Sequence, residues 1–211
     1  MINLIDLTLY LVLDANLCPT PEKMAKTALE AVRGGATVVQ LRAPEWKKRK
    51  QLEAALLLKK ALYGTGVPLI IDDHLDIALI CHADGVHVGQ ADLPVSEVRK
   101  LMGPKAIIGL SVGTPSELTT VTPEVDYLGI GPVFATSTKK DAGKAIGIEG
   151  LRELAGQTNL PIVAIGGINS SNARETMEAG VQGVAVVSAI CGAPSPYEAA
   201  KILYSEVCSV D

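Results

Sequence analysis

Aromatic residues and long apolar runs are both scarce in this sequence. Aromatic side chains make up 3% of the 211 residues, with one Trp and one Phe, so the core must be aliphatic and a platform for stacking nucleic-acid bases is not expected. The longest apolar stretches are about six residues, far below the ~20 that a membrane helix needs. Residues 1–6 also lack the basic flank and apolar segment of an export signal. We therefore expect no membrane partner.

The chain also lacks a basic excess and clustered cysteines. Nineteen Lys and Arg against 23 Asp and Glu give a net charge of -4, which argues against binding to a nucleic-acid backbone. The four cysteines, Cys18, Cys81, Cys191 and Cys208, lie far apart and form no C-x-x-C pair. Neither structural zinc nor a disulfide scaffold is indicated. Thiols of this kind fit a protein of the reducing cytoplasm. The sequence leaves open whether the chain forms homo-oligomers.

Short β-rich apolar runs alternate with amphipathic stretches along the whole chain. The predicted strands cover 9–13, 38–41, 68–71, 85–88, 106–110, 127–130, 161–165 and 183–187. The predicted helices begin after Thr20, at Trp46, near Leu75, at Val95, after Thr114, at Ile148, at Asn172 and at Pro196. Thr20-Pro21 is typical of a helix start, and Thr114 to Glu117 has the spacing of a capping box.

This alternation predicts a parallel, eight-stranded (β/α)8 TIM barrel. Uninterrupted Val, Ile and Leu runs are typical of parallel strands covered on both faces, and eight βα units in about 200 residues suit a closed barrel near its minimum size. A doubly wound open sheet is the alternative, but no G-x-G-x-x-G follows the first strand. No linker divides the chain, so residues 1–211 are predicted to form one domain.

Unusual polar residues gather directly after the predicted strands. Gln40 and Arg42 end the second strand and, being two apart, point to the same side of it. Other such positions follow the remaining strands: Asp72, Asp73, Asp92, Ser111, the segment 136–140, Gly166, Gly167 and Ser188. In a parallel barrel these strand ends form the rim that carries active sites. We therefore expect these separate segments to converge on one opening.

The rim residues predict two anion sites of different kinds. Gly166-Gly167 and Val187-Ser188 offer backbone N–H groups for a phosphate, in the region where barrel enzymes often bind one. Asp73 and Asp92 are hard oxygen ligands suited to a Mg²⁺ ion that carries phosphate oxygens. Arg42 and Lys139 add positive charge. These patterns predict one monophosphate and, separately, one metal-bound diphosphate.

Each of these features also has a simpler explanation. Asp72-Asp73 could cap the following helix, and Lys139-Lys140 could be solvated loop charges. Gly166-Gly167 could form only a tight turn. His87, inside a strand, is interpreted as a packed histidine. Convergence on one rim favours the functional interpretation for the Asp, Thr and Lys positions.

From about Leu9 to Ile190 the sequence resembles the thiamine phosphate synthase family. The resemblance rests on the order of several motifs: VQLR at 39–42, IIDD at 70–73, ADGVHVGQADLP at 83–94, IGLSV at 108–112, GIGPVFATSTKKDA at 129–142 and VAIGGI at 163–168. It implies an enzyme that condenses 4-amino-2-methyl-5-hydroxymethylpyrimidine diphosphate with hydroxyethylthiazole phosphate. The products would be thiamine monophosphate and pyrophosphate.

The resemblance also implies a role for each matching residue. Asp73 and Asp92 would hold Mg²⁺. The pyrimidine diphosphate would contact Gln40, Arg42, Asp72, Ser111 and Lys139, of which Arg42, Ser111 and Lys139 are the candidate catalytic residues. The thiazole phosphate would contact Thr136, Thr138, Gly167, Val187 and Ser188.

Two departures from the family pattern concern the diphosphate site. Ala43-Pro44 replaces a Glu-Lys pair, and Lys47 or Lys48 is the expected substitute for the missing charge. Asp72 stands where the family has Asn, and we expect it to join the Mg²⁺ shell.

Two other functions remain open. A thiazole tautomerase-like paralogue would share the barrel, but its proton-transfer histidine is missing from Ser111-Val112-Gly113. A non-catalytic barrel that binds thiamine precursors is the other alternative, for which Pro44 is the main support.

Overall fold

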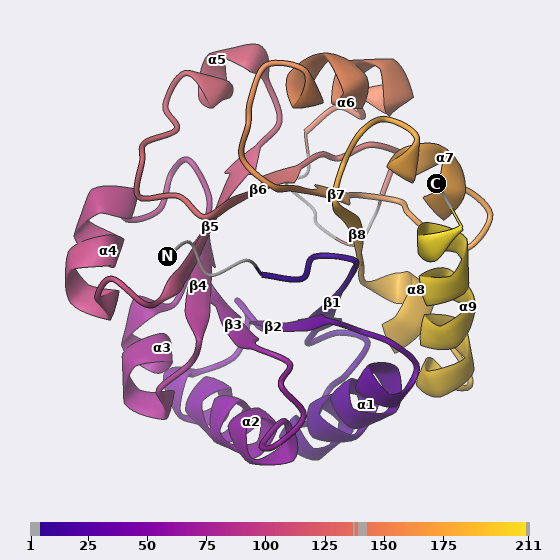
Figure 1. Cartoon of the computed structure of the whole chain (residues 1–211). Helices are drawn as coiled ribbons and strands as arrows, with labels where there is room; N and C mark the ends of the chain where they lie inside the picture. Colours follow the sequence, from indigo (N-terminus) through magenta and orange to yellow (C-terminus); the bar gives the residue numbers. More distant parts are fainter. Residues whose placement is uncertain (1–4, 137, 139–142, 210–211) are drawn as a thin grey trace.

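Eight parallel strands close on themselves to form a barrel (Figure 1). The computed structural model describes residues 5–136, 138 and 143–209. Each strand pairs with its neighbours in chain order, and β1 pairs with β8 to complete the ring. The strands are β1 (Leu9–Asp14), β2 (Val38–Arg42), β3 (Leu69–Asp72), β4 (Gly85–Val88), β5 (Ile107–Val112), β6 (Tyr127–Ile130), β7 (Ile162–Ile165) and β8 (Gly183–Val186). The predicted TIM barrel is confirmed, and the open-sheet alternative is wrong.

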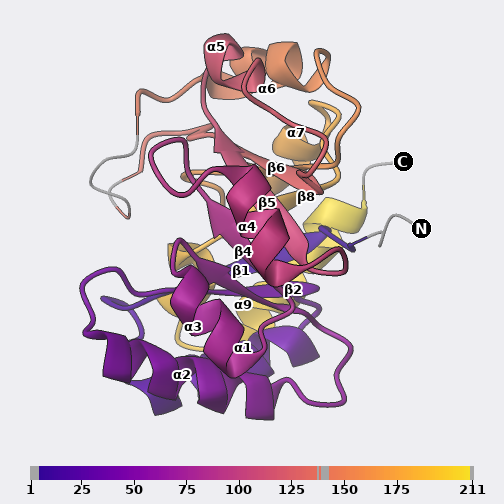
Figure 2. The same ribbon diagram turned by 90° about the vertical axis from the view of Figure 1, so that its left-hand side faces the viewer.

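Helices surround the strands, and Figure 2 shows them above and below the barrel in side view. They are α1 (Pro21–Arg33), α2 (Lys48–Ala61), α3 (Leu75–Cys81), α4 (Val95–Met102), α5 (Pro115–Leu118), α6 (Gly147–Ala155), α7 (Ala173–Met177), α8 (Ser188–Cys191) and α9 (Pro196–Cys208). Helix α2 begins two residues later than predicted, and α7 is shorter. Helix α8 was not predicted, because four residues are too few to show a helical period.

Local capping explains where several helices begin. The Oγ1 of Thr20 accepts a hydrogen bond from the Lys23 N–H at the start of α1. The Oγ1 of Thr114 accepts from the Glu117 N–H at the start of α5, and Oε2 of Glu117 accepts from the Gly113 N–H. Both predicted helix starts are therefore confirmed, since each cap satisfies N–H groups that the helix itself leaves unpaired.

The alternation of side chains along each strand divides the core into two layers. Leu9, Leu11 and Leu13 of β1 belong to the larger layer, between strands and helices. Tyr10 and Val12 belong to the smaller layer inside the barrel. Successive strand residues point to opposite faces, so every second residue of a strand can reach the barrel interior. This periodicity decides which residues can line a site there.

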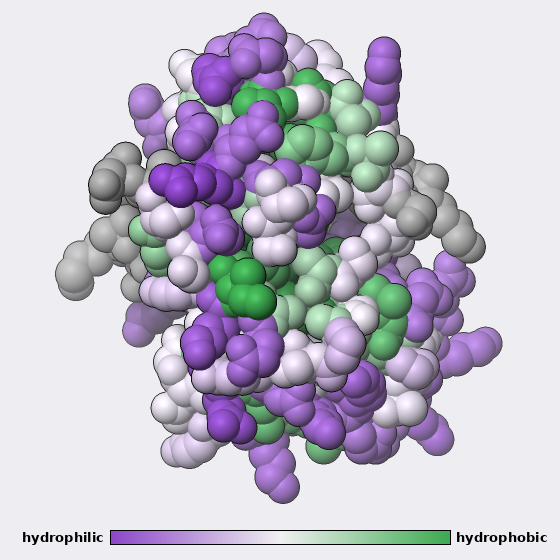
Figure 3. All heavy atoms as spheres, turned by 90° about the vertical axis from the view of Figure 1, so that its right-hand side faces the viewer, coloured by the Kyte–Doolittle hydropathy of each residue, from purple (hydrophilic) through white to green (hydrophobic). Residues whose placement is uncertain are grey.

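The described surface mixes hydrophilic and hydrophobic side chains. Figure 3 shows the face that carries α7 and α9, where hydrophobic residues lie among hydrophilic ones. Among the described residues, no helix has the length and apolar character needed to span a membrane.

The four cysteines are free thiols, three of them buried and Cys208 exposed. The cytoplasmic location stays a prediction, and the oligomeric state stays open.

Candidate active site

Two adjoining cavities lie at the carboxyl ends of the strands. The inner cavity has a volume of about 200 Å³ and reaches down to Tyr10 and Tyr127 inside the barrel. The outer cavity has a volume of about 1340 Å³ and is lined by the loops after the strands. Both are lined by Arg42, Ser111, Gly131, Pro132, Thr138 and Gly143. Two ligands bound in them would therefore lie next to each other.

The inner cavity brings together most of the residues predicted to bind substrate. Those that line it are Gln40, Arg42, Asp72, Ser111, Thr136, Thr138, Gly167, Val187 and Ser188. They come from the ends of six strands and the loops after them, so their predicted convergence is confirmed. Their ligands stay predictions. Lys139 lies outside the described residues.

The two predicted metal ligands line the outer cavity instead. Asp92 is held by the backbone, since its Oδ2 accepts a hydrogen bond from the Gly89 N–H at 2.8 Å. Asp73 has a left-handed backbone, with φ at 56°, and its N–H donates to the His87 carbonyl oxygen. Asp tolerates this conformation better than most residues. Among the described residues, no group of three or more acidic, His or Cys side chains could hold a metal. Asp73 and Asp92 are two of the five acidic residues that line the outer cavity.

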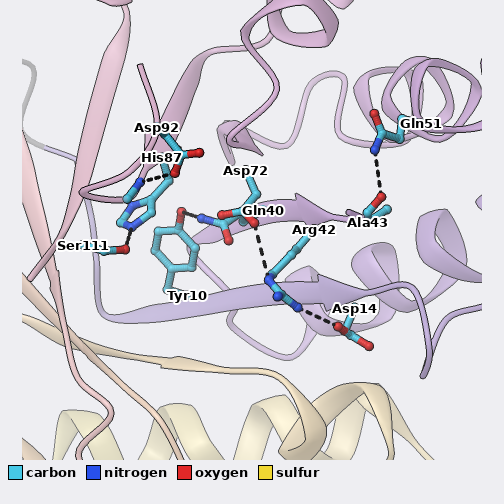
Figure 4. A network of polar contacts seen from close by, with 11 residues as sticks. Tyr10, Asp14, Gln40, Arg42, Ala43, Gln51, Asp72, His87, Asp92 and Ser111 are labelled. Atoms are coloured by element: carbon cyan, nitrogen blue, oxygen red, sulfur yellow. Dashed lines mark hydrogen bonds and ion pairs between the residues drawn. The ribbon is translucent and has the colours of Figure 1, made fainter. Parts of the chain in front are cut away.

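Arg42 bridges two carboxylates at the base of the rim (Figure 4). Its Nη1 donates to Oδ2 of Asp14 at 3.0 Å, and its Nε lies 3.4 Å from Oδ2 of Asp72. Asp14 is 2% exposed, and the strand register sets it directly beside Arg42. Asp72 lines the inner cavity and not the outer one. Asp72 therefore shares the positive charge of Arg42 with Asp14, and the structure gives no support to its expected place in a metal shell.

The Asp72-Asp73 pair lies directly before α3. The N-cap residue of that helix is His74, whose own side chain makes no cap hydrogen bond. Each aspartate lines one of the two cavities, Asp72 the inner one and Asp73 the outer one, which agrees with the functional interpretation of the pair.

Backbone groups form one wall of the inner cavity. Gly166 and Gly167 have φ values of 104° and 68°, a region that side chains other than glycine rarely adopt. A Cβ on Gly167 would also come within 2.7 Å of the Phe134 Cβ. The Asn172 side chain fixes this turn by donating to the Gly167 carbonyl oxygen at 3.1 Å. The turn therefore depends on glycine at both positions, as an anion-binding turn would.

The floor of the inner cavity contains three polar residues that the sequence analysis missed. His87 was interpreted as a packed histidine, but it lines the cavity, and its Nε2 lies 2.9 Å from the Ser111 Oγ. Tyr10 and Tyr127 are joined through their hydroxyl groups at 2.9 Å. A sequence signal was present: Gly109 lies inside a predicted strand, and glycine there often marks a close approach of other groups.

The loop after β2 has Ala43-Pro44 where the family pattern has a Glu-Lys pair, so it lacks the positive charge of that lysine. Gln51 is buried and donates from Nε2 to the Ala43 carbonyl oxygen at 2.8 Å, which holds this loop (Figure 4). Lys47 and Lys48, the expected substitutes, line neither cavity. Lys48 instead pairs with Asp76 at 2.9 Å. Lys144 does line the outer cavity, so the expectation for Lys47 and Lys48 is not supported.

Comparison with known proteins adds to this geometry. Residues 9–190 match the family model described as thiamine monophosphate synthase. Thiamine-phosphate synthase of Laribacter hongkongensis is 53% identical over 97% of both chains, and that of Azorhizobium caulinodans is 50% identical over 94% of this chain and 93% of its own. The structure of thiamine phosphate pyrophosphorylase from Pyrococcus furiosus superposes with a TM-score of 0.87 at 36% identity, covering 97% of both chains. The chain is therefore an enzyme of the transferase class and belongs to the thiamine monophosphate synthase family.

Proposed function

We propose that this enzyme condenses 4-amino-2-methyl-5-hydroxymethylpyrimidine diphosphate with hydroxyethylthiazole phosphate to give thiamine monophosphate and pyrophosphate. The observation that carries the proposal is the pair of adjoining cavities that share Arg42 and Ser111. The inner one has a glycine turn suited to a phosphate, and the outer one has two carboxylates suited to a metal-bound diphosphate. Two substrates with these charges can then meet where the cavities join.

Asp73 and Asp92 suit Mg²⁺ as its protein ligands. Magnesium in phosphate-binding sites is commonly held by one or two carboxylates, with water and substrate phosphates completing its shell. Both carboxylates line the outer cavity, and the Gly89 N–H fixes one oxygen of Asp92. When bound, the metal supplies positive charge to the diphosphate oxygens.

In the proposed reaction the protein stabilises the leaving pyrophosphate and does not supply a general base. The bond between the pyrimidine methylene carbon and the diphosphate oxygen breaks, and the oxygen keeps the electron pair. The lone pair of the thiazole nitrogen then forms the new carbon–nitrogen bond. Arg42, Ser111 and Lys139 are proposed to stabilise the negative charge that develops on the leaving pyrophosphate, because preorganised donors act most strongly where charge develops.

The remaining contacts position the acceptor. The N–H groups of Gly167, Val187 and Ser188, together with the hydroxyls of Thr136 and Thr138, are proposed to hold the thiazole phosphate. All five residues line the inner cavity.

Gln40 and Asp72 also line the inner cavity. They are proposed to contact the other substrate, the pyrimidine diphosphate.

One observation bears on the tautomerase alternative. Residues 111–113 contain no histidine, but His87 reaches the Ser111 hydroxyl from β4. A tautomerase built on this histidine–serine pair would not need the carboxylates of Asp73 and Asp92 in the outer cavity, so the synthase remains the function that the whole site supports best.

The test is the release of pyrophosphate by the purified full chain with both substrates and Mg²⁺. We expect release only when both substrates are present, with thiamine monophosphate formed in equal amount. Binding of both substrates without release would support the non-catalytic alternative. Isomerisation of the thiazole without pyrophosphate release would support the tautomerase.

A further inference from the structure

Five side chains from five strands form a continuous chain of hydrogen bonds beneath the inner cavity. Gln40 Nε2 lies 2.8 Å from the Tyr10 hydroxyl, which lies 2.9 Å from the Tyr127 hydroxyl. The Tyr127 hydroxyl lies 3.0 Å from His87 Nδ1, and His87 Nε2 lies 2.9 Å from the Ser111 Oγ. Part of this chain is visible in Figure 4, where Gln40 points to Tyr10 and His87 points to Ser111. Its two ends are both predicted substrate contacts.

The first donor fixes one end of the chain. An amide nitrogen can only donate, so the Tyr10 oxygen accepts from Gln40. When each hydroxyl gives its one hydrogen to the next member of the chain, Tyr10 donates to Tyr127 and Tyr127 donates to Nδ1 of His87. A neutral imidazole that accepts at one nitrogen donates at the other, so Nε2–H donates to the Ser111 oxygen.

Burial keeps both phenols able to donate. Tyr10 and Tyr127 are fully buried, and this burial raises the pKa of both hydroxyls well above their ordinary value. Each therefore keeps its hydrogen at neutral pH and can pass a hydrogen bond along the chain.

Two strand glycines make room for these contacts. A Cβ on Gly109 would lie 2.3 Å from His87 Nδ1 and 2.5 Å from the Tyr127 hydroxyl oxygen. A Cβ on Gly129 would lie 2.9 Å from His87 Cε1. Real Cβ atoms do not come this close, so the His87–Tyr127 contact requires glycine at position 109 of β5 and position 129 of β6.

We infer that Tyr10, Tyr127 and His87 are positioning residues that hold His87 in its Nε2–H form and so leave the Ser111 hydroxyl hydrogen directed into the cavity as a donor. Ser111 lines both cavities, and its oxygen already accepts from His87. Its hydrogen is therefore available to an acceptor on the substrate. That the acceptor belongs to the pyrimidine diphosphate rests on the proposed function; the tautomer and the direction of the chain do not.

The direction is tested by ¹⁵N NMR of the histidine side chains in the full chain without substrate. The protein has three histidines, and the variants His74→Gln and His82→Gln assign their signals. We expect His87 to carry its hydrogen on Nε2, with a pyridine-like shift at Nδ1. A hydrogen on Nδ1 would overturn the inference. This measurement needs no catalytic activity, so its outcome is independent of the pyrophosphate test.

Two phenylalanine variants separate positioning from packing. Tyr127→Phe removes the donor to Nδ1, and we expect a mixture of the two His87 tautomers with a fall of about fivefold in kcat/KM for the pyrimidine diphosphate. Tyr10→Phe leaves Tyr127 able to donate, so His87 should keep its Nε2 hydrogen. Tyr63→Phe is the control, because Tyr63 is 90% exposed and lines neither cavity. An unchanged tautomer in a folded Tyr127→Phe protein would overturn the inference, and if that variant does not fold, the tautomer of the unmodified chain decides it.

Discussion

Arg42 and Asp14 form an ion pair with a Nη1–Oδ2 distance of 3.0 Å at the ends of neighbouring strands. The Asp14 side chain is 3% exposed and that of Arg42 is 18% exposed. Arg42 is thus tied to β1 as well as to its own strand. The residue proposed to meet the diphosphate is held in place by a buried carboxylate that lines the outer cavity but not the inner one.

Replacing Asp14 by Asn should destabilise the protein. The change keeps the side-chain shape but leaves the Arg42 charge with only the longer contact to Asp72, so we expect the free energy of unfolding to fall by about 1–3 kcal/mol. Urea denaturation measures it. The matched control is Asp76→Asn, whose carboxylate pairs with Lys48 on the surface and should cost below about 0.5 kcal/mol. Equal effects of the two changes would contradict the structural role of Asp14.

Neutralising the carboxylates of the outer cavity should raise the demand for metal. With Asp92→Asn or Asp73→Asn, we expect the Mg²⁺ concentration for half-maximal pyrophosphate release to rise by about tenfold or more, because each change removes one of two charged ligands. Glu45→Gln is the control, since Glu45 lines the same cavity but is not assigned to the metal. A Mg²⁺ dependence that stays the same in both Asp variants would exclude this site.

Lys144 should contribute more to diphosphate binding than Lys47 or Lys48. It lines the outer cavity, where a positive charge can approach the diphosphate. We expect Lys144→Ala to raise the KM for the pyrimidine diphosphate by about threefold to tenfold, an ordinary value for one solvated charge contact. The Lys47→Ala, Lys48→Ala double variant is the control and should leave this KM unchanged. The reverse order would restore the original expectation for Lys47 and Lys48.

Alkaline pH should destabilise the fold through two of its five tyrosines. Burial raises the pKa of Tyr10 and of Tyr127 above the ordinary value of 10.0, so above pH 10 the unfolded chain releases protons that the folded chain retains. The stability from each phenol is present below pH 10 and is lost as the pH rises above it. We expect the free energy of unfolding to fall by about 1.4 kcal/mol per pH unit for each phenol.

Absorbance of phenolate at 295 nm, followed with far-UV circular dichroism, checks this loss. Two phenolates should form only as the helical signal disappears. Tyr10→Phe and Tyr127→Phe should each remove one of these late ionisations. Complete ionisation of all tyrosines in a protein that still has its native circular dichroism would contradict the prediction.

Much of the architecture could be predicted from local pattern. Aliphatic runs such as 183–187 alternate with segments that begin at caps such as Thr20, and this order implies parallel strands joined by helices. Once the barrel is accepted, residues after the strands must share one rim. That Gln40 and Ser188 line the same cavity could therefore be predicted, although they are far apart in the sequence.

The sequence could not predict which side chains of different strands contact each other inside the closed barrel. Gly109 signals a close approach near Ser111, but the sequence does not reveal that His87 is the group that reaches it. Nothing near Arg42 reveals that Asp14 takes part of its charge. The period of two along a strand predicts only which face of the sheet each side chain occupies. The partner on that face is set by the register of the strands and the closure of the ring, which only the packed barrel establishes.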